Sequence, residues 1–201
     1  MQSNSKVLYI VLGIAVVLVL WVWTGYNGLV GSKAAVEGAW ANVETQYQRR
    51  FDLVPNLVST VKGAANFEQS TLLAVTEART NWLKATSSAK EMAGQADSSV
   101  PRAQQIIAAQ QFDSAFSRLL VSVEAYPQLQ ATQAFRDLMT QLEGTENRIS
   151  VARRDYNMAV QTYNVRVARF PSNLLAGIFG FGPEKLFSAQ EGAENAPAVN
   201  F

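Results

Sequence analysis

The chain has 201 residues and contains neither cysteine nor histidine. Without cysteine no disulfide can form, and the sequence gives no sign of the redox compartment. Without histidine there is no Ser-His-Asp triad, no imidazole base and no His or Cys ligand for a metal. The remaining candidates for catalysis are Asp, Glu, Lys, Tyr, Ser and Thr, and none of these stands in a recognisable motif. We therefore expect no enzymatic activity and no cofactor.

An excess of charge of one sign is also lacking. Lys and Arg number 17, and Asp and Glu number 16. A protein that binds nucleic acid usually presents a basic face, and no basic cluster of that kind is present. We therefore expect no nucleic-acid partner.

One long hydrophobic run lies near the amino terminus. Residues 7–23, VLYIVLGIAVVLVLWVW, carry no charge. As a helix this run is roughly 26 Å long, and extending it to Tyr26 covers the ~30 Å hydrocarbon core of a bilayer. Trp21, Trp23 and Tyr26 lie at one end, where amphipathic rings prefer the headgroup level. We expect residues 7–26 to be a transmembrane anchor that follows a short tail, residues 1–6.

Two other interpretations of this run were weighed. A cleaved signal peptide has a shorter apolar region, of ~7–15 residues, followed closely by a cleavage site of small residues. Here the nearest such pair, Ser32 and Ala34, lies well past the run. A buried core helix would need more apolar partners than the amphipathic remainder provides. Lys6 and the amino group precede the anchor and Lys33 follows it, which favours a cytoplasmic amino terminus and an extracytoplasmic main domain.

After the anchor, apolar residues recur at steps of three and four, which predicts helices and no strands. A first helix is expected from about Leu29 to Lys62, and a second around residues 72–83. Residues 86–101, rich in Ser, Ala and Gly, are expected to form a loop or the fraying ends of helices. A third helix is expected from Arg102 to Ala125, because Tyr126 precedes a proline and should leave the helical region.

The fourth period is the most regular. It predicts a long helix with a coiled-coil-like seam, whose inward residues are Phe135, Leu138, Leu142, Thr145, Ile149, Ala152, Tyr156, Val160, Tyr163 and Val167. Pro171 should close it, and Ser172 should cap a short apolar segment. The tail, residues 188–201, is expected to be disordered. The predicted fold is all-α: a transmembrane helix followed by an elongated antiparallel helical bundle over residues 29–187.

The stretch RRFDLVPNLV, residues 49–58, places charges within an apolar stripe. Arg50 falls on the inward side and needs a partner, for which the long fourth helix offers Glu146 and Asp155. Pro55 should kink or restart the first helix, and Asn56 could bond the carbonyl that it frees. Arg153 and Arg154 could pair with Asp52. The favoured interpretation is a structural ion-pair cluster, with a catalytic or ligand site as the alternative, formed by Arg49, Arg50, Asp52, Asn56, Glu146, Arg153, Arg154 and Asp155.

The short segment at residues 173–181 is apolar on nearly all sides. It could cap the bundle core, or it could contact the membrane or a partner protein. Both interpretations stay open at this stage. The residues concerned are Leu174, Leu175, Ile178, Phe179 and Phe181.

Several blocks carry a resemblance to a known family. They are YNGLV (26–30), QRRFDLVPNLV (48–58), TENRISVARRDYNMAVQTYN (145–164), FPSN (170–173) and FGF (179–181). In order and spacing this sequence resembles the LemA family. The resemblance implies a single-pass protein of the bacterial inner membrane with a helical-bundle domain. It brings no catalytic residues, and it links members to membrane remodelling, including magnetosome vesicle formation, and to neighbouring membrane proteases.

Two functions follow as hypotheses. The first is a non-enzymatic scaffold that is anchored in membrane lipid, self-assembles as a homo-oligomer and organises or remodels the inner membrane. The second is an adaptor or regulator of a membrane protein partner, such as a membrane-bound protease. An enzyme that uses the Arg/Asp/Glu residues is disfavoured, because an active site normally needs a concave pocket with convergent polar groups.

Overall fold

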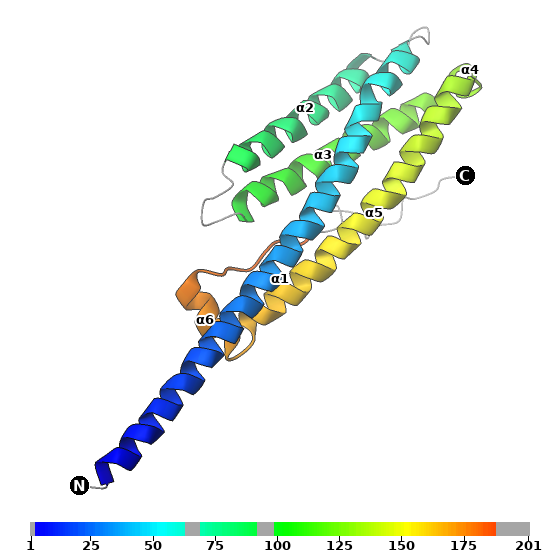
Figure 1. Ribbon diagram of the computed structural model, residues 1–201. Coiled ribbons are helices and arrows are strands. Elements are labelled where there is room, and N and C mark those ends of the chain that lie inside the picture. Colours follow the sequence, from blue (N-terminus) through cyan, green and yellow to red (C-terminus); the bar gives the residue numbers. More distant parts are fainter. Residues whose placement is uncertain (1–2, 63–68, 92–98, 188–201) are drawn as a thin grey trace, which may run out of the picture.

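The computed structural model describes residues 3–62, 69–91 and 99–187, and within these ranges it is helical without strands. The helices are α1 (Ser3–Lys62), α2 (Gln69–Glu91), α3 (Ser99–Glu124), α4 (Pro127–Gln130), α5 (Gln133–Ala168) and α6 (Ser172–Phe179). The long helices alternate in direction and form an elongated bundle (Figure 1). The all-α prediction, with an apolar amino-terminal helix before the bundle, is confirmed. The expected disorder of 188–201 lies outside the described residues.

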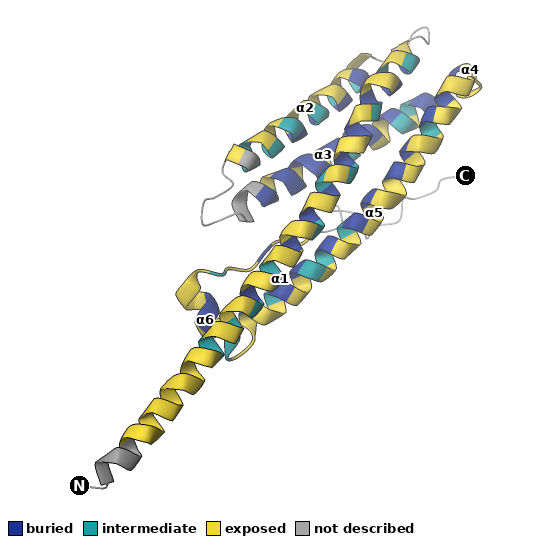
Figure 2. Cartoon of the chain, viewed as in Figure 1, coloured by how far each residue is buried: buried dark blue, intermediate teal, exposed yellow. Residues whose placement is uncertain are grey.

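Helix α1 unites the predicted anchor and the first bundle helix in one rod of 60 residues. Its amino-terminal turns project beyond the other helices and are exposed on all sides (Figure 2). Leu8 is 65% exposed and Leu20 is 50% exposed. By length and composition this part of α1 is apolar enough to cross a membrane.

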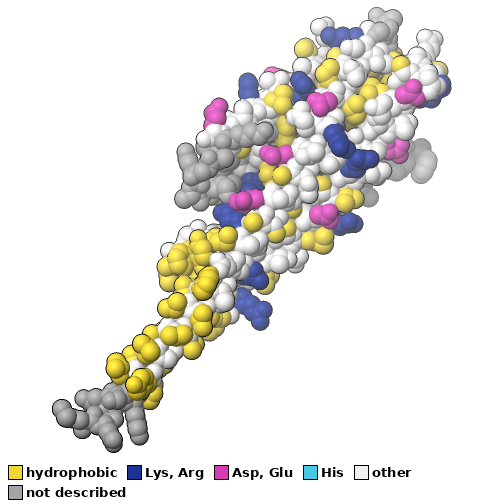
Figure 3. All heavy atoms as spheres, viewed as in Figure 1, with side chains coloured by type: hydrophobic (Ala, Val, Ile, Leu, Met, Phe, Trp, Pro, Cys, Tyr) yellow, Lys and Arg dark blue, Asp and Glu magenta, His cyan; other side chains and the backbone are white. Residues whose placement is uncertain are grey.

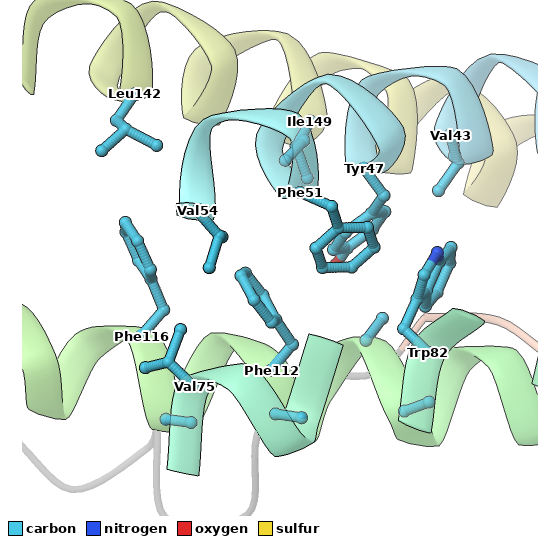
Figure 4. Close-up of a cluster of buried hydrophobic side chains, with 14 of the residues drawn as sticks. Val43, Tyr47, Phe51, Val54, Val75, Trp82, Phe112, Phe116, Leu142 and Ile149 are labelled. Atoms are coloured by element: carbon cyan, nitrogen blue, oxygen red, sulfur yellow. The ribbon is translucent and has the colours of Figure 1, made fainter. Parts of the chain in front are cut away.

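The bundle consists of two helix pairs that face each other. Helix α5 packs along α1, and α2 packs along α3. Aromatic side chains join the pairs (Figure 4): Tyr47 stacks on Trp82 with ring centroids 4.7 Å apart, and Phe51 meets the edge of Phe112 at 4.6 Å. These rings are almost fully buried. Because aromatic rings bury large apolar areas, this contact holds the α2–α3 pair on the α1–α5 pair.

The buried side of α5 is the one that the sequence period predicted. Thr132 caps the helix by accepting a hydrogen bond from the Phe135 amide, 3.3 Å away. Val167, the last residue of the predicted stripe, is half-buried. The other predicted inward residues are all buried: Phe135, Leu138, Leu142, Thr145, Ile149, Ala152, Tyr156, Val160 and Tyr163.

Two local expectations are wrong. The predicted loop at 86–101 is too long, since α2 continues to Glu91 and α3 begins at Ser99. Pro101 falls in the first turn of α3, where its missing N–H would have had no partner within the helix. Ser172 does not cap α6; Pro171 holds the cap position without a side-chain bond, and the Asn173 amide donates to the Arg169 carbonyl at 2.9 Å.

The predicted restart of the first helix at Pro55 is wrong, since α1 passes through this residue. A proline leaves the carbonyl four residues earlier without its helical donor. Here that carbonyl belongs to Phe51, and it accepts a hydrogen bond from Arg79 Nε of α2 at 3.2 Å. The role expected for Asn56 is therefore taken by Arg79, and the Asn56 side chain is exposed. The carbonyl that Pro55 leaves without a helical donor therefore links α1 to α2.

Arg79→Met is expected to lower the free energy of unfolding by about 1–2 kcal/mol, because the buried Phe51 carbonyl loses its donor. In a Pro55→Ala background a main-chain N–H again reaches this carbonyl, so the same substitution should cost less. Urea unfolding of the full-length protein in detergent, followed by circular dichroism, measures both losses. Equal losses in the two backgrounds would show that Arg79 acts through another contact.

Candidate functional site

Arg50 of α1 lies at the centre of a polar cluster and is its most deeply buried charge. The residue is only 5% exposed. Its Nη1 lies 2.8 Å from Asp113 Oδ1 of α3 and 3.0 Å from Glu146 Oε2 of α5. Its guanidinium also stacks over Phe116, 4.4 Å from the ring centroid. A buried cation requires such partners, and Arg50 thereby connects three helices.

Asp113 is the shared carboxylate of this cluster, although the sequence did not predict it. Its Oδ1 accepts a hydrogen bond from Arg50 Nη1. Its Oδ2 accepts hydrogen bonds from Arg153 and, at 3.3 Å, from the Tyr47 hydroxyl. Burial, followed by the charge of Asp113, raises the pKa of Tyr47 well above its ordinary value. Tyr47 therefore stays a protonated donor. The sequence signal that could have identified Asp113 was an acidic residue directly after Phe112, which lies on the inward stripe of α3.

We call Tyr47, Arg50, Asp113, Glu146 and Arg153 the arginine–carboxylate cluster. Both oxygens of Asp113 are engaged by guanidinium groups, Oδ1 by Arg50 and Oδ2 by Arg153. Such charge-assisted contacts stabilise the ionised carboxylate. Arginine itself does not exchange its proton near neutral pH. The chemistry of the cluster is therefore that of an ionic tie between α1, α3 and α5.

The other predicted cluster residues lie outside it. Arg49 and Asp52 are exposed, and Asp52 Oδ1 accepts a hydrogen bond from Gln48 at 2.9 Å. Two residues along a helix correspond to about 200°, so Asp52 faces away from Arg50. Arg154 and Asp155 form an exposed pair at 3.7 Å. The expected pairing of Asp52 with Arg153 and Arg154 is wrong, because Arg153 turns inward to Asp113 of α3.

A cleft of about 590 Å³ opens between α3 and α5 beside the arginine–carboxylate cluster. Arg50, Asp113, Glu146 and Arg153 of the cluster line it, together with Gln110, Ser117 and Glu143 and the apolar side chains Phe116, Leu120, Met139, Leu142 and Phe187. In the part of the chain that the structure describes, no group of three or more His, Cys, Asp or Glu residues could hold a metal ion.

A second polar site binds the segment that follows α6, residues 181–187, which we call the C-terminal strap. Two Tyr-Asn pairs, seven residues apart on α5, hold its main chain. Asn164 exchanges two hydrogen bonds with the main chain of Glu184, both 2.8 Å, and Asn157 exchanges two with Phe187, at 2.9 and 3.0 Å. Tyr163 donates to the Gly182 carbonyl at 2.9 Å, and Tyr156 donates to the Lys185 carbonyl at 2.8 Å.

The spacing of these bonds explains the shape of the strap. Seven residues of helix rise roughly 10 Å, and three residues of extended chain span a similar length. Glu184 and Phe187, like Gly182 and Lys185, are three residues apart, so an extended main chain matches the α5 period. Burial raises the pKa of Tyr156 to about 12 and also raises the pKa of Tyr163. Both hydroxyls therefore remain donors at neutral pH.

The strap also carries side chains into the bundle. The Glu184 side chain is buried, with Oε2 2.8 Å from Arg102 Nη1 of α3 and Oε1 3.8 Å from Lys33 Nζ of α1. The ring of Phe187 stacks on Trp40 at 5.7 Å. The strap thus joins α1, α3 and α5 at a second place along the bundle, apart from the arginine–carboxylate cluster. No strap residue except Phe181 was among the predicted site residues, although the Tyr-Asn repeat at heptad spacing was a visible signal.

The predicted apolar segment at 173–181 contains α6, and its two sides have different surroundings. Leu175 is 2% exposed and packs with Leu29, whereas Leu174 and Ile178 are 52% and 75% exposed. Phe179 and Phe181 contact the ring of Tyr26 at 4.8 and 5.9 Å. One side of this segment therefore packs on the bundle, as the first alternative predicts, and the other side is exposed.

These features define a class: a helical bundle built on a long apolar helix, with its elements tied by buried ions and by a carboxy-terminal strap. The sequence profile described as the LemA family matches residues 39–201. The chain therefore belongs to the LemA family.

Two similar relatives are Magnetosome proteins MamQ 2 and MamQ 1 of Paramagnetospirillum magneticum strain AMB-1. Each is 30% identical over 186 residues, which covers 87% of this chain and 68% of the relative. Protein LemA of Metamycoplasma hominis is 22% identical over 165 residues, which covers 82% of this chain and 69% of that protein.

Asp113→Asn should lower the free energy of unfolding by about 2–4 kcal/mol, because Arg50 and Arg153 lose their shared carboxylate. Asp155→Asn is the matched control on an exposed pair and should change it by less than about 0.5 kcal/mol. Arg50→Ala should likewise lower the thermal midpoint. Chemical unfolding in detergent measures the free energies of unfolding of the two Asp variants, and thermal unfolding measures the midpoint of Arg50→Ala. A loss for Asp155→Asn as large as that for Asp113→Asn would contradict the assigned tie.

Asn164→Ala should release the strap while leaving the bundle folded. The loss of two hydrogen bonds is expected to speed exchange of the Glu184 amide roughly tenfold. Hydrogen–deuterium exchange of residues 181–187 measures this, with helix content checked by circular dichroism. Asn147→Ala, at an exposed position of α5, is the control and should leave this exchange unchanged. Unaltered protection in Asn164→Ala would show that the two bonds of Asn164 do not hold the strap at Glu184.

Proposed function

We propose that this chain is a non-enzymatic scaffold of the bacterial inner membrane, anchored by α1 and assembled from several copies. The observation that carries the proposal is the continuity of α1, whose exposed apolar turns run into the bundle core as one helix. A bundle joined in this way moves with its anchor. Forces between bundles would therefore reach the bilayer without a flexible linker.

The family supports work at a membrane. Two relatives are named as magnetosome proteins, and the family resemblance links members to magnetosome vesicle formation. The described polar groups support a non-enzymatic role, because the half-buried carboxylate of Asp113 is paired with two arginines. Organising membrane through protein–protein contacts needs a rigid body and self-complementary surfaces, and it needs no reactive group.

The outer side of α5 offers a surface for self-assembly. Val151, Met158 and Val165 recur at seven-residue intervals and are 47%, 52% and 57% exposed. Copies anchored in one bilayer share their orientation, so two α5 helices related by a twofold axis along the membrane normal would run parallel and in register. Arg154 and Asp155, exposed beside this stripe, would then lie near the opposite charge of the second copy.

Met158→Cys tests this arrangement directly, since the chain has no other cysteine. In membranes this variant should form a disulfide-linked dimer under mild oxidation. Thr80→Cys, at an exposed position of α2, is the control and should stay monomeric. Met158→Glu should lower the mass of the assembly, measured by analytical ultracentrifugation. A strictly monomeric protein at every concentration, with no Met158→Cys cross-link, would overturn the proposed self-assembly.

The orientation in the membrane is part of the proposal. The positive-inside rule counts basic residues within roughly 15–20 residues of the span. Lys6 and the amino group lie on one side and Lys33 on the other, which favours a cytoplasmic amino terminus and an extracytoplasmic bundle. In intact cells, the cysteine of Thr80→Cys should therefore react with a membrane-impermeant maleimide.

An adaptor or regulator of a membrane enzyme, such as a protease, is the second candidate. The observation that favours it is the cleft between α3 and α5, whose volume of about 590 Å³ combines apolar walls with a charged end. A monomeric protein that co-purifies from membranes with one dominant foreign protein would favour the adaptor over the scaffold.

A further inference from the structure

Helix α6 presents an apolar surface at the point where α1 leaves the bundle. Leu175 and Ala176 turn inward and pack on Leu29, while Leu174 and Ile178 turn outward. Phe170, in the turn before α6, is 74% exposed, and Phe170, Leu174 and Ile178 recur every four residues. Figure 3 shows hydrophobic side chains gathered around α6 and over the amino-terminal turns of α1. This apolar surface is therefore continuous with that of α1.

The contacts of α6 place this surface at a defined height along α1. A Cβ at Gly25 would overlap the Leu175 side chain, so glycine at this position allows α6 to approach closely. Tyr26 meets the ring of Phe179 at 4.8 Å. A span that begins at Val7 covers ~30 Å after about 20 residues, which is at Tyr26. The docking site of α6 thus coincides with the edge of the hydrocarbon core.

A hollow of about 420 Å³ lies between Phe179 and the last turns of the apolar segment. Its walls are Leu18, Val19, Val22, Trp23, Tyr26 and Phe179. Apolar walls at this height match the end of a lipid acyl chain, because a hollow of this kind gives water few polar partners.

Charge at this end of the bundle has one sign. No Asp or Glu occurs before Glu37 or between Asp155 and Glu184. Arg166 and Arg169 stand at the end of α5, and both are exposed. Arg166 donates to the Gly28 carbonyl, which fixes the end of α5 to α1. Arg169 forms no side-chain ion pair among the described residues, and it lies beside the exposed Phe170.

We propose that α6 and Phe170 lie in the headgroup–acyl boundary of the bilayer on the bundle side, with an acyl chain in the hollow beneath Phe179 and an anionic headgroup at Arg169. This inference rests on the proposed anchor and adds a second membrane contact to it. A short helix with exposed apolar side chains and cations nearby is suited to this boundary. Two contacts fix the tilt and rotation of the bundle, whereas a lone span would leave rotation free.

Single cysteines for a fluorescent probe test this in the full-length protein, held as one copy per lipid nanodisc. The sites are Ile178→Cys on α6, Val16→Cys in the apolar segment and Thr140→Cys on the exposed side of α5 far from α6. With quenchers attached to the lipids, Ile178→Cys should be quenched most by a shallow quencher. Val16→Cys should be quenched most by a deep one, and Thr140→Cys by neither.

The outcomes separate the inference from the proposed anchor. If Val16→Cys is quenched but Ile178→Cys behaves like Thr140→Cys, the anchor stands and the α6 contact is overturned. If neither is quenched, the anchor itself fails. Protection of Ile178→Cys that appears only when several copies share a liposome would assign this surface to a second copy, which also overturns the inference.

A comparison of two lipid compositions tests the proposed headgroup contact at Arg169. Shallow quenching at Ile178→Cys should be stronger in nanodiscs containing phosphatidylglycerol than in nanodiscs of phosphatidylcholine alone, and Arg169→Gln should remove that difference. Arg118→Gln, an exposed arginine on α3, is the matched control and should retain it. Equal quenching in both lipids would overturn the anionic headgroup at Arg169.

Discussion

The pairing of α1 with α5 is the interaction on which the rest of the molecule depends. Each helix carries a continuous apolar stripe, and each stripe is covered by the other helix and by the α2–α3 pair (Figure 4). Burial of such side chains contributes roughly 1.5–3 kcal/mol each, and it must offset the ordering of a long chain. The pair also sets the geometry of both polar sites, since α5 supplies Glu146 and Arg153 to one and the Tyr-Asn repeat to the other.

The buried polar groups fix how the remaining elements sit on this pair. Apolar stripes tolerate sliding by a turn, whereas a carboxylate shared by two arginines does not. Asp113 sets the position of α3 against α1 and α5, and Arg79 sets that of α2 through the Phe51 carbonyl. The strap adds a third constraint, because its side chains reach Arg102 and Trp40 only when Glu184 and Phe187 lie opposite Asn164 and Asn157.

The same pairing places the end of α5 and α6 beside the apolar part of α1, because α5 runs back along α1. Gly25 gives room there for Leu175, and the Gly28 carbonyl accepts a hydrogen bond from Arg166. The end of a domain that begins with a membrane span thus returns to the height at which that span ends. A continuous α1 and a returning α6 are the features on which the proposed membrane role rests.

Much of the fold could be predicted from the sequence, because the 3.6-residue period is a local property. The period alone identified the inward residues of α5 and the inward position of Arg50. It could not assign Asp113 to Arg50 and Arg153, since that choice depends on how α3 is aligned with two helices distant in sequence. Nor could it reveal the strap, which is recognised through main-chain atoms common to every residue type.

The sequence by itself thus determined which segments are helical and which side of each is buried, because neighbouring residues encode both. Only the tertiary structure decided which charges meet, how Pro55 is accommodated and where α6 and the strap come to rest. Those outcomes depend on the relative positions of whole helices, and these positions are fixed by packing across the bundle.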